Sequence, residues 1–265
     1  MPDIASQTND LLHQYFDKVL VMTVPRFKER HERVKERLAG INFEFFFGAD
    51  KNELDEKSIH HVYHYKPENT LAVRQVFPAL NKGEIACSLS HRMIYQAMLD
   101  NNWQRVLIFE DDVVPDYTTL PMLANCLKEL PADWELFYLG YLKNEKATFG
   151  KKLKIFWYKI MAMLGMSRMP ASMLNNVLPR PFSSCLMKAG FHDCTHAYAI
   201  SLKGAKKLLE IQTPVQYRAD NLLSVMVLKG KMKAFISKAN LFNQEIFSDI
   251  TNKSYVRKDP KLNTE

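Results

Sequence analysis

The chain has 265 residues, of which 47% are hydrophobic and 25% are charged. This balance excludes a disordered or fibrous protein and predicts one globular domain with a full core. The first sixteen residues lack the basic start and long apolar stretch of a secretory signal, and Lys159 interrupts the longest apolar stretch, around 155–165. We therefore expect a cytoplasmic protein without a membrane span.

The formal net charge of +7 is concentrated in one segment. Residues 143–168 hold seven basic residues against one acid, Glu145, and so carry +6 of that total. The cysteines are widely spaced and form no Cys-x-x-Cys pair, which argues against a zinc knuckle or a disulfide framework. They are Cys87, Cys126, Cys185 and Cys194.

Strands and helices are expected to alternate in the first half of the chain. Apolar runs and helical periodicity predict strands at 18–24, 43–47, 105–109 and 134–140, and helices at 26–39, 83–100 and 119–130. The polar residues 50–82 predict a loop region with short helices. This order of elements indicates right-handed crossovers and a mostly parallel sheet flanked by helices, an α/β fold.

The alternation stops after Gly140 for about fifty residues, which predicts a basic insertion around 143–190 or a mobile flap. It then resumes. We expect strands at 196–202 and 232–237, helices at 203–211 and 219–230, and a polar, frayed tail from 252.

Three adjacent acids, Glu110, Asp111 and Asp112, follow the strand at 105–109. Ligands of an open parallel sheet bind outside the carboxyl ends of its strands. Side chains alternate along a strand, so Glu110 and Asp112 are expected on one side and Asp111 on the other. Two carboxylates on one side can hold Mg²⁺ or Mn²⁺, which in turn binds diphosphate oxygens. Solvated acids, or caps of a following helix, are the alternative.

Residues 81–117, NKGEIACSLSHRMIYQAMLDNNWQRVLIFEDDVVPDY, resemble the signature of glycosyltransferase family 25. That signature is Gly-Glu-(Ile/Val)-Gly-Cys-x-x-Ser-His, a helix, and a strand ending in Leu-Ile-x-Glu-Asp-Asp. Ala86 stands where the family usually has Gly. The family includes bacterial lipopolysaccharide galactosyltransferases and their collagen-modifying relatives. The resemblance implies a GT-A type (Rossmann-like) fold, a UDP-sugar donor, a divalent metal and transfer to a glycan.

The resemblance also implies a division of the single domain. Residues 1–140 would be the nucleotide-sugar-binding half, 141–195 the insertion or flap, 196–251 the acceptor and catalytic half, and 252–265 the tail.

Donor-site residues are carried over from the same resemblance. The expected donor contacts are Thr23, Val24, Arg30, Asp50, Glu84, Ser90, His91, Glu110, Asp111 and Gln244, with Ser248 as a further contact. Purely structural roles are the alternative for several of them. Arg30 suits a solvated helix face, Asp50 a loop cap, and His91 a core histidine.

The expected metal ligands are Asp112, Glu110 and one late histidine, His196 or alternatively His192. Asp111 is expected to orient a ribose, a sugar hydroxyl or a neighbouring basic group. The catalytic base is expected to be Asp220, since an inverting transfer needs one carboxylate to take the acceptor's proton. An aspartate at the start of a helix is also a common N-cap, which is the alternative for Asp220.

The segment 151–168 mixes lysines with aromatic and aliphatic residues. It fits a helix on an anionic membrane surface, here the cytoplasmic face of an inner membrane, and equally a flap over the donor.

The sequence thus predicts an inverting enzyme that moves a hexose from a UDP-sugar, UDP-galactose before UDP-glucose. The expected acceptor is a lipopolysaccharide core or another surface glycan, including a lipid-linked oligosaccharide. The competing classes are a metal-dependent phosphohydrolase and a basic nucleic-acid-binding protein. Nucleic acid is not expected as a partner, because the three acids would repel a phosphate backbone.

Overall fold

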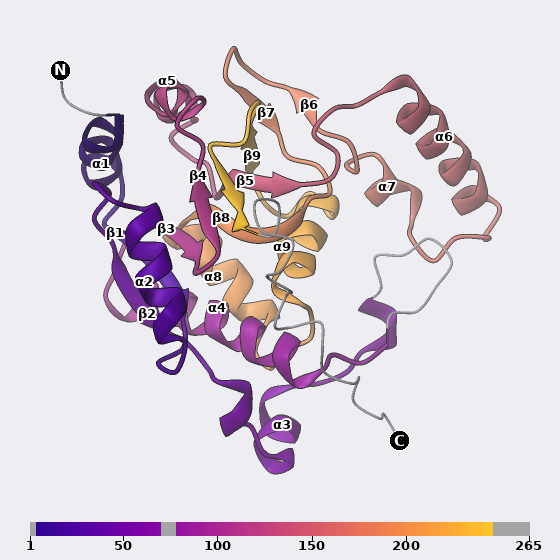
Figure 1. Cartoon of the computed structure of the whole chain (residues 1–265). Coiled ribbons are helices and arrows are strands. Elements are labelled where there is room, and N and C mark those ends of the chain that lie inside the picture. The colour runs from indigo at the N-terminus through magenta and orange to yellow at the C-terminus, as the bar shows by residue number, and fades with distance from the viewer. Residues whose placement is uncertain (1–3, 70–77, 246–265) are drawn as a thin grey trace.

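The computed structural model describes residues 4–69 and 78–245. Its centre is an eight-stranded sheet in the order β2-β1-β3-β8-β5-β9-β7-β6, and β10 pairs with β4 separately (Figure 1). The strands are β1 (Lys18–Thr23), β2 (Glu44–Phe47), β3 (Arg105–Glu110), β4 (Val113–Pro115), β5 (Leu136–Leu142), β6 (Arg180–Pro181), β7 (Leu186–Lys188), β8 (Asp193–Ser201), β9 (Ala234–Ser237) and β10 (Phe242–Gln244).

Helices surround this sheet. They are α1 (Ile4–Tyr15), α2 (Lys28–Arg37), α3 (Glu56–Val62), α4 (Lys82–Asp100), α5 (Leu123–Glu129), α6 (Phe149–Met163), α7 (Ala171–Leu174), α8 (Leu202–Ile211) and α9 (Ala219–Leu228). Within the part of the chain that is described, none of them combines the length and the apolar character that crossing a bilayer would require.

The predicted α/β class, a sheet flanked by helices, is confirmed. The strand directions are more mixed than the alternation of elements indicates. β1 runs parallel to β2 and β3, and β5 runs parallel to β9. β8 lies between β3 and β5 and is antiparallel to both, and β7 is antiparallel to β9. Periodicity predicts that a strand exists, but the direction of a strand depends on which neighbours it joins.

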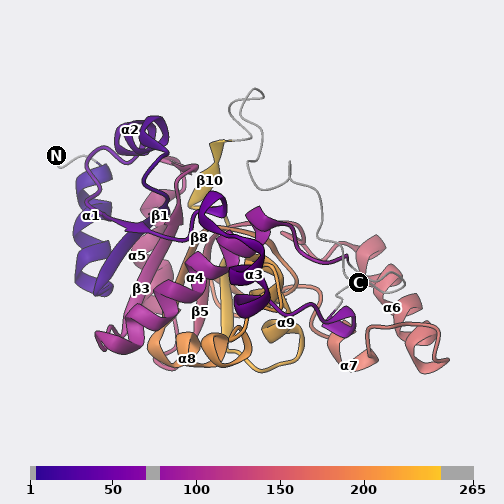
Figure 2. The same ribbon diagram turned by 90° about the horizontal axis from the view of Figure 1, so that it is seen from below.

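The core lies on both faces of the sheet, because strand side chains alternate between them. Tyr198 and Ile200 of β8 pack with residues of α4, α8 and α9. Ala197 and Ala199 of the same strand pack with residues of α1, α2 and α5. Figure 2, seen from below, shows α4 and α8 on the side of the sheet that faces the viewer.

The segment after β5 is more than an inserted flap. Its α6 and α7 lie at the end of the molecule opposite α1 and α2 in both views (Figure 1, Figure 2). β6 and β7, however, extend the central sheet beyond β9. Two- and three-residue strands carry too little periodicity to be recognised in a sequence.

Two further features were not expected from the sequence. Helix α1 buries Ala5, Thr8 and Leu12. The β4–β10 pair places Gln244 opposite Val113, directly after the acidic triplet. This pairing carries the end of the described chain back to the carboxyl end of β3.

Candidate active site

A cavity of about 450 Å³ opens at the carboxyl ends of β1 and β3. Small-molecule sites commonly have volumes of about 300 to 1,000 Å³. The predicted residues that line the cavity are Thr23, Val24, Arg30, Asp50, Glu84, Ser90, Glu110, Asp111, Asp112, Asp220 and Gln244. His91 and His196 are not among its lining residues. Side chains from both halves of the chain therefore converge on one concave site, at the edge where ligands of such sheets bind.

Asp111 is engaged by protein partners. The Thr23 hydroxyl donates a hydrogen bond to Asp111 Oδ2 at 2.7 Å, and the Arg30 guanidinium forms an ion pair with the same carboxylate. Burial raises the pKa of Asp111, against the lowering effect of Arg30. The Arg30 side chain is 19% exposed, so it belongs to the cavity wall rather than to a solvated helix face.

Glu110 is held from two sides. The Thr195 hydroxyl of β8 donates a hydrogen bond to Glu110, and His91 Nε2 of α4 lies 3.5 Å from Glu110 Oε1. Burial acts to raise the pKa of Glu110, but His91 and the Thr195 hydroxyl lower it below its usual value. Glu110 is therefore a fixed negative charge at the floor of the cavity. Thr195 was not predicted from the sequence, because its role depends on β8 lying beside β3.

Asp112 has the most perturbed carboxyl group of the three. Burial first, and then the neighbouring Glu110 and Asp111, raise the pKa of Asp112 to about 7. Its Oδ1 is buried and accepts no hydrogen bond from any residue that the structure describes. Magnesium and manganese ions prefer oxygen ligands. Such a cation would neutralise the repulsion among the three carboxylates and would give the buried Oδ1 a partner. The chemistry of this carboxylate fits the predicted cation.

His196 and His192 were the alternative histidine ligands. His192 Nδ1 donates to the Lys143 carbonyl and its Nε2 accepts from the Gly190 amide, so both ring nitrogens are used. His196 Nε2 donates to the Phe242 carbonyl at 3.1 Å, and its buried Nδ1 has no hydrogen-bond partner within residues 4–69 and 78–245. Burial lowers the pKa of His196, which favours the neutral ring. Of the two, only His196 has a nitrogen left for a metal.

The structure does not gather Asp112, Glu110 and His196 into one tight cluster. Among the described residues, the group of three possible ligands whose atoms lie within 4.8 Å of one another is Cys87, His91 and Glu110. The predicted metal triad remains a prediction.

Helix α4 uses its predicted site residues to position the cavity wall. Asn81 and Glu84 form a capping box, with hydrogen bonds of 2.8 and 2.9 Å. The Ser90 hydroxyl donates to the Ala86 carbonyl and accepts from the Ala49 amide at 3.0 Å. Ser90 thereby fixes the loop after β2 against α4.

Asp50, at the end of that loop, is placed for both of its predicted roles, a donor contact and a loop cap. It lines the cavity, and its side chain also accepts from the Asn52 amide at 2.9 Å, which caps the 3-10 helix 51–53. Arg26 pairs with it. Burial acts to raise the pKa of Asp50, but Arg26 and the Asn52 amide lower it below its usual value. Arg26, which packs over the Phe27 ring at 4.5 Å, was not predicted from the sequence.

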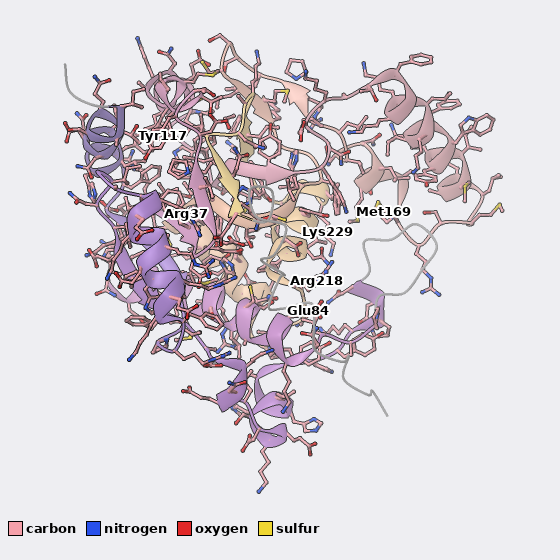
Figure 3. The ribbon with its side chains drawn as sticks, in the orientation of Figure 1. Arg37, Glu84, Tyr117, Met169, Arg218 and Lys229 are labelled. Atoms are coloured by element: carbon pink, nitrogen blue, oxygen red, sulfur yellow. The ribbon has the colours of Figure 1, made fainter. Side chains whose placement is uncertain are left out.

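Asp220 is not the N-cap of its helix, so that alternative is wrong. Helix α9 begins at Ala219 after an Arg218 N-cap, which makes Asp220 the second helical residue. Its Oδ1 accepts from the Asn221 amide at 2.7 Å, and burial raises its pKa. Arg218 bridges to α4, with its Nη1 at 3.7 Å from Glu84 Oε1 (Figure 3). Asp220 thus faces the cavity with a raised affinity for a proton.

Glu245, at the end of the described chain, is a further acid of the site that was not predicted from the sequence. Glu245 lines the cavity and pairs with Arg33 and Arg37 of α2. Its amide donates to the Asp112 carbonyl at 2.8 Å, which ties β10 to the acidic triplet. Ser248 lies outside the described residues.

Sequence comparisons with known proteins point to one family. Residues 16–223 match the profile of glycosyltransferase family 25 (LPS biosynthesis protein). Procollagen galactosyltransferase 1 of Danio rerio is 25% identical over 240 residues, which are 84% of this chain and 33% of that protein. The inactive glycosyltransferase 25 family member 3 of Homo sapiens is 33% identical over 138 residues, which are 50% of this chain and 18% of that one.

The chain thus spans a third or less of the length of these two relatives. Among solved structures, a glycosyltransferase involved in the glycosylation of the major capsid of PBCV-1 aligns with a TM-score of 0.42 at 9% identity. The alignment covers 85% of this chain and 90% of that chain.

Proposed function

The chain belongs to glycosyltransferase family 25, and on this premise we propose that it is an active transferase that moves a hexose from a UDP-sugar to a glycan hydroxyl with inversion. One relative in the family is named inactive, so the case for turnover rests on the residues of this chain. The observation that carries it is the convergence of Asp220, Arg30 and the acidic triplet on one cavity. Galactose is the proposed sugar, because a relative over 84% of the chain is named a galactosyltransferase. Glucose is the alternative.

The proposed chemistry assigns the proton to Asp220. The acceptor oxygen attacks the anomeric carbon while the bond from that carbon to the nucleoside diphosphate breaks on the opposite side. The hydroxyl proton passes to an Asp220 carboxylate oxygen. A raised pKa suits this role, since a base is most effective when its pKa lies near the working pH. Arg30 lies in the cavity wall, where its positive charge would stabilise the negative charge of the departing diphosphate.

We propose Asp112 and Glu110 as the residues that would hold Mn²⁺ or Mg²⁺, with His196 as a third ligand. Asp112 and His196 each have a buried atom without a hydrogen-bond partner among the described residues, and of the two only Asp112 lines the cavity. When bound, the cation would neutralise charge on the diphosphate leaving group.

The proposed acceptor is a lipopolysaccharide core or another surface glycan on a lipid anchor. Its support is the outer face of α6. Seven large apolar side chains are exposed between residues 149 and 166, and on α6 they recur at helical spacing. They are Phe149, Leu153, Phe156, Trp157, Met163, Leu164 and Met166. The opposite side of α6 packs on the core through Ile155, Tyr158 and Ala162.

This outward face suits an anionic membrane. Lys152 and Lys154 are exposed beside it, and each lysine near such a surface contributes about 1 kcal/mol. The alternative, a flap over the donor, has less support, because no described residue of α6 lines the cavity. The proposed location is the cytoplasmic face of the inner membrane, with α6 lying in the interface.

Vesicle flotation tests this contact. The full chain should float with vesicles containing anionic lipid and not with purely zwitterionic ones. The double variant Phe156→Ser, Trp157→Ser should stay in solution, while Met93→Ser, which changes an exposed side chain on α4, should float like the parent. Equal flotation of all three proteins would rule out α6 as the contact.

The transferase is tested by donor binding and by product formation. A UDP-sugar that binds the folded chain should raise its melting temperature in the presence of Mn²⁺, and UDP-galactose should do so most strongly. Sugar release that does not depend on any acceptor would instead favour a phosphohydrolase. No stabilisation by any UDP-sugar, with or without Mn²⁺, would contradict the proposal.

A further inference from the structure

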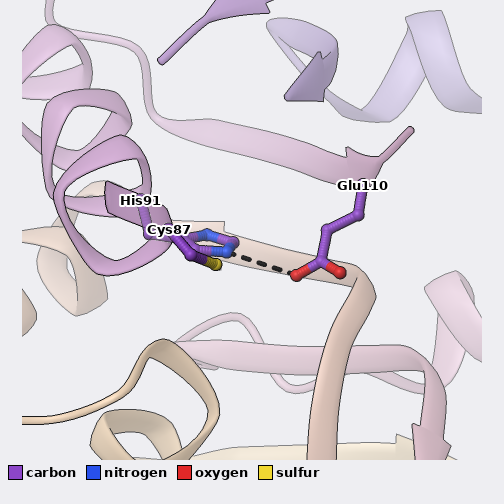
Figure 4. Close-up of side chains that lie close together, drawn as sticks. All are labelled: Cys87, His91 and Glu110. Atoms are coloured by element: carbon purple, nitrogen blue, oxygen red, sulfur yellow. Dashed lines mark ion pairs between the residues drawn. The ribbon is translucent and has the colours of Figure 1, made fainter. Parts of the chain in front are cut away.

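Three possible metal ligands meet beside the acidic triplet, and one of them, Glu110, is also a ligand of the cation proposed at Asp112. Cys87 and His91 are four residues apart on α4 and therefore share one face of the helix. Figure 4 shows both side chains pointing at Glu110, at the end of β3. The ligand atoms of all three lie within 4.8 Å of one another, and His91 Nε2 is 3.5 Å from Glu110 Oε1.

His91 supplies the observation that points to a ligand. The residue is 1% exposed, yet its Nε2 forms no hydrogen bond within the described part of the chain. The other ring nitrogen, Nδ1, lies 2.8 Å from the Tyr198 hydroxyl, which is itself 2.8 Å from the Tyr95 hydroxyl. Without a cation, the Nε2–H tautomer of His91 faces Glu110 Oε1 at 3.5 Å. In the proposed bound state Nδ1 donates to Tyr198, and Nε2 turns its lone pair to the cation.

We propose that Cys87, His91 and Glu110 form a binding site for a thiophilic divalent cation, Zn²⁺ in particular. Zinc binds imidazole nitrogen and carboxylate oxygen at about 2.0 to 2.1 Å, which places two tetrahedral ligands about 3.3 Å apart. The observed separation of 3.5 Å between His91 and Glu110 is close to that distance. The Cys87 sulfur lies within 4.8 Å of the other two ligand atoms, so its side chain would have to rotate to bind the same ion. The thiol proton leaves to solvent as the sulfur binds the ion.

This site shares Glu110 with the one proposed at Asp112, but its other two ligands are of a different chemical type. A thiolate with an imidazole selects zinc, whereas carboxylate oxygens select magnesium and manganese. Cys87 and Glu110 both line the cavity, so an ion can enter from it. Three protein ligands also leave a fourth position open toward the cavity. The Tyr198 hydroxyl would orient the imidazole, as partners of metal-bound histidines commonly do.

Zinc binding can be measured directly, without reference to transfer activity. The metal-free full chain is titrated with Zn²⁺ in competition with a chromophoric chelator. One tight equivalent is expected. Cys87→Ser and His91→Gln should each weaken binding about 100-fold or more, and Tyr198→Phe about 10- to 100-fold. Cys194→Ser is the matched control, because Cys194 lines the same cavity outside the proposed site; its affinity should equal that of the parent.

Cobalt gives an independent readout. Co²⁺ bound to the parent should show thiolate-to-metal charge-transfer absorption, which Cys87→Ser should abolish and Cys194→Ser should retain. Parent protein without tight zinc binding, or without this absorption, would overturn the proposal. Unchanged zinc affinity in folded Cys87→Ser protein would do the same, as would loss of binding in Asp112→Asn but not in Cys87→Ser. The parent spectrum decides the matter even if a variant does not fold.

Discussion

Replacing Asp112 with asparagine should flatten the dependence of folding stability on pH in the metal-free chain. The pKa of Asp112 is about 7 in the folded protein, against an ordinary value of 3.8. Its folded-state pKa is raised, so the folded chain binds this proton more tightly than the unfolded chain does. Stability is therefore greatest where Asp112 is protonated and is lost as pH rises toward and through 7.

The magnitude follows from the two pKa values. One pKa unit corresponds to about 1.4 kcal/mol, and integrating the linkage relation from pH 5 to pH 8 gives a loss of roughly 2.5 kcal/mol. This is a large part of the stability of an ordinary domain, which is about 5 to 15 kcal/mol. The neutral asparagine should lack this contribution.

Urea denaturation at pH 5 and pH 8, with chelator present, measures the effect. Other groups titrate in the same range, so the quantity of interest is the pH-dependent change of the parent minus that of Asp112→Asn. Asp10→Asn, at an exposed position of α1, provides the matched control and should behave like the parent. The reasoning is refuted if Asp112→Asn and the parent lose the same free energy between the two pH values. Mn²⁺ at pH 8 should stabilise the parent more than Asp112→Asn.

Three further substitutions have defined outcomes. Asp220→Asn should lower turnover by about 10²- to 10⁴-fold while calorimetry shows unchanged UDP binding; near-parent turnover would exclude it as the base. Ser90→Ala removes the hydrogen-bond partner of the Ala49 amide and should lower the free energy of unfolding, measured in urea, by about 1 to 2 kcal/mol. An unchanged free energy of unfolding would mean that water replaces the hydroxyl. Gly140→Ala would put a Cβ 2.3 Å from His196 Nε2 and 2.4 Å from the Phe242 carbonyl oxygen. It should destabilise the chain by about 1 to 3 kcal/mol, whereas Gly150→Ala, with open space around it, should not.

The sequence predicts those site residues whose position depends on a single strand or helix. The acids could be placed at a ligand-binding edge because they end an apolar strand, and parallel strands present that edge together. Thr23 and Val24 follow from the same argument for β1. Asp220 could be found as a carboxylate on a helix start, although only the structure shows that Arg218 occupies the N-cap position.

The remaining parts depend on pairings between distant segments. Thr195 reaches Glu110 only because β8 lies next to β3, and Glu245 reaches Asp112 only through the β4–β10 pair. No periodicity encodes either neighbour. Ser90 and Glu84 show a different difficulty, since the same side chain caps or braces α4 and also lines the cavity. A motif match cannot separate these roles.

The position of β8 in the sheet also has a consequence for biosynthesis. Arg105 of β3 is paired with Ser201 of β8, 96 residues later in the chain. Until the ribosome has delivered residues 193–201, one edge of β3 and both edges of β5 lack their hydrogen-bonding partners, since β9 follows later still. Exposed apolar edges are sites of aggregation. We therefore expect the open edges of the nascent chain to need protection from aggregation until β8 has been synthesised and the sheet can close. A fragment ending at residue 140 would keep these edges open permanently, so we expect it to be recovered only with a bound chaperone or as an aggregate.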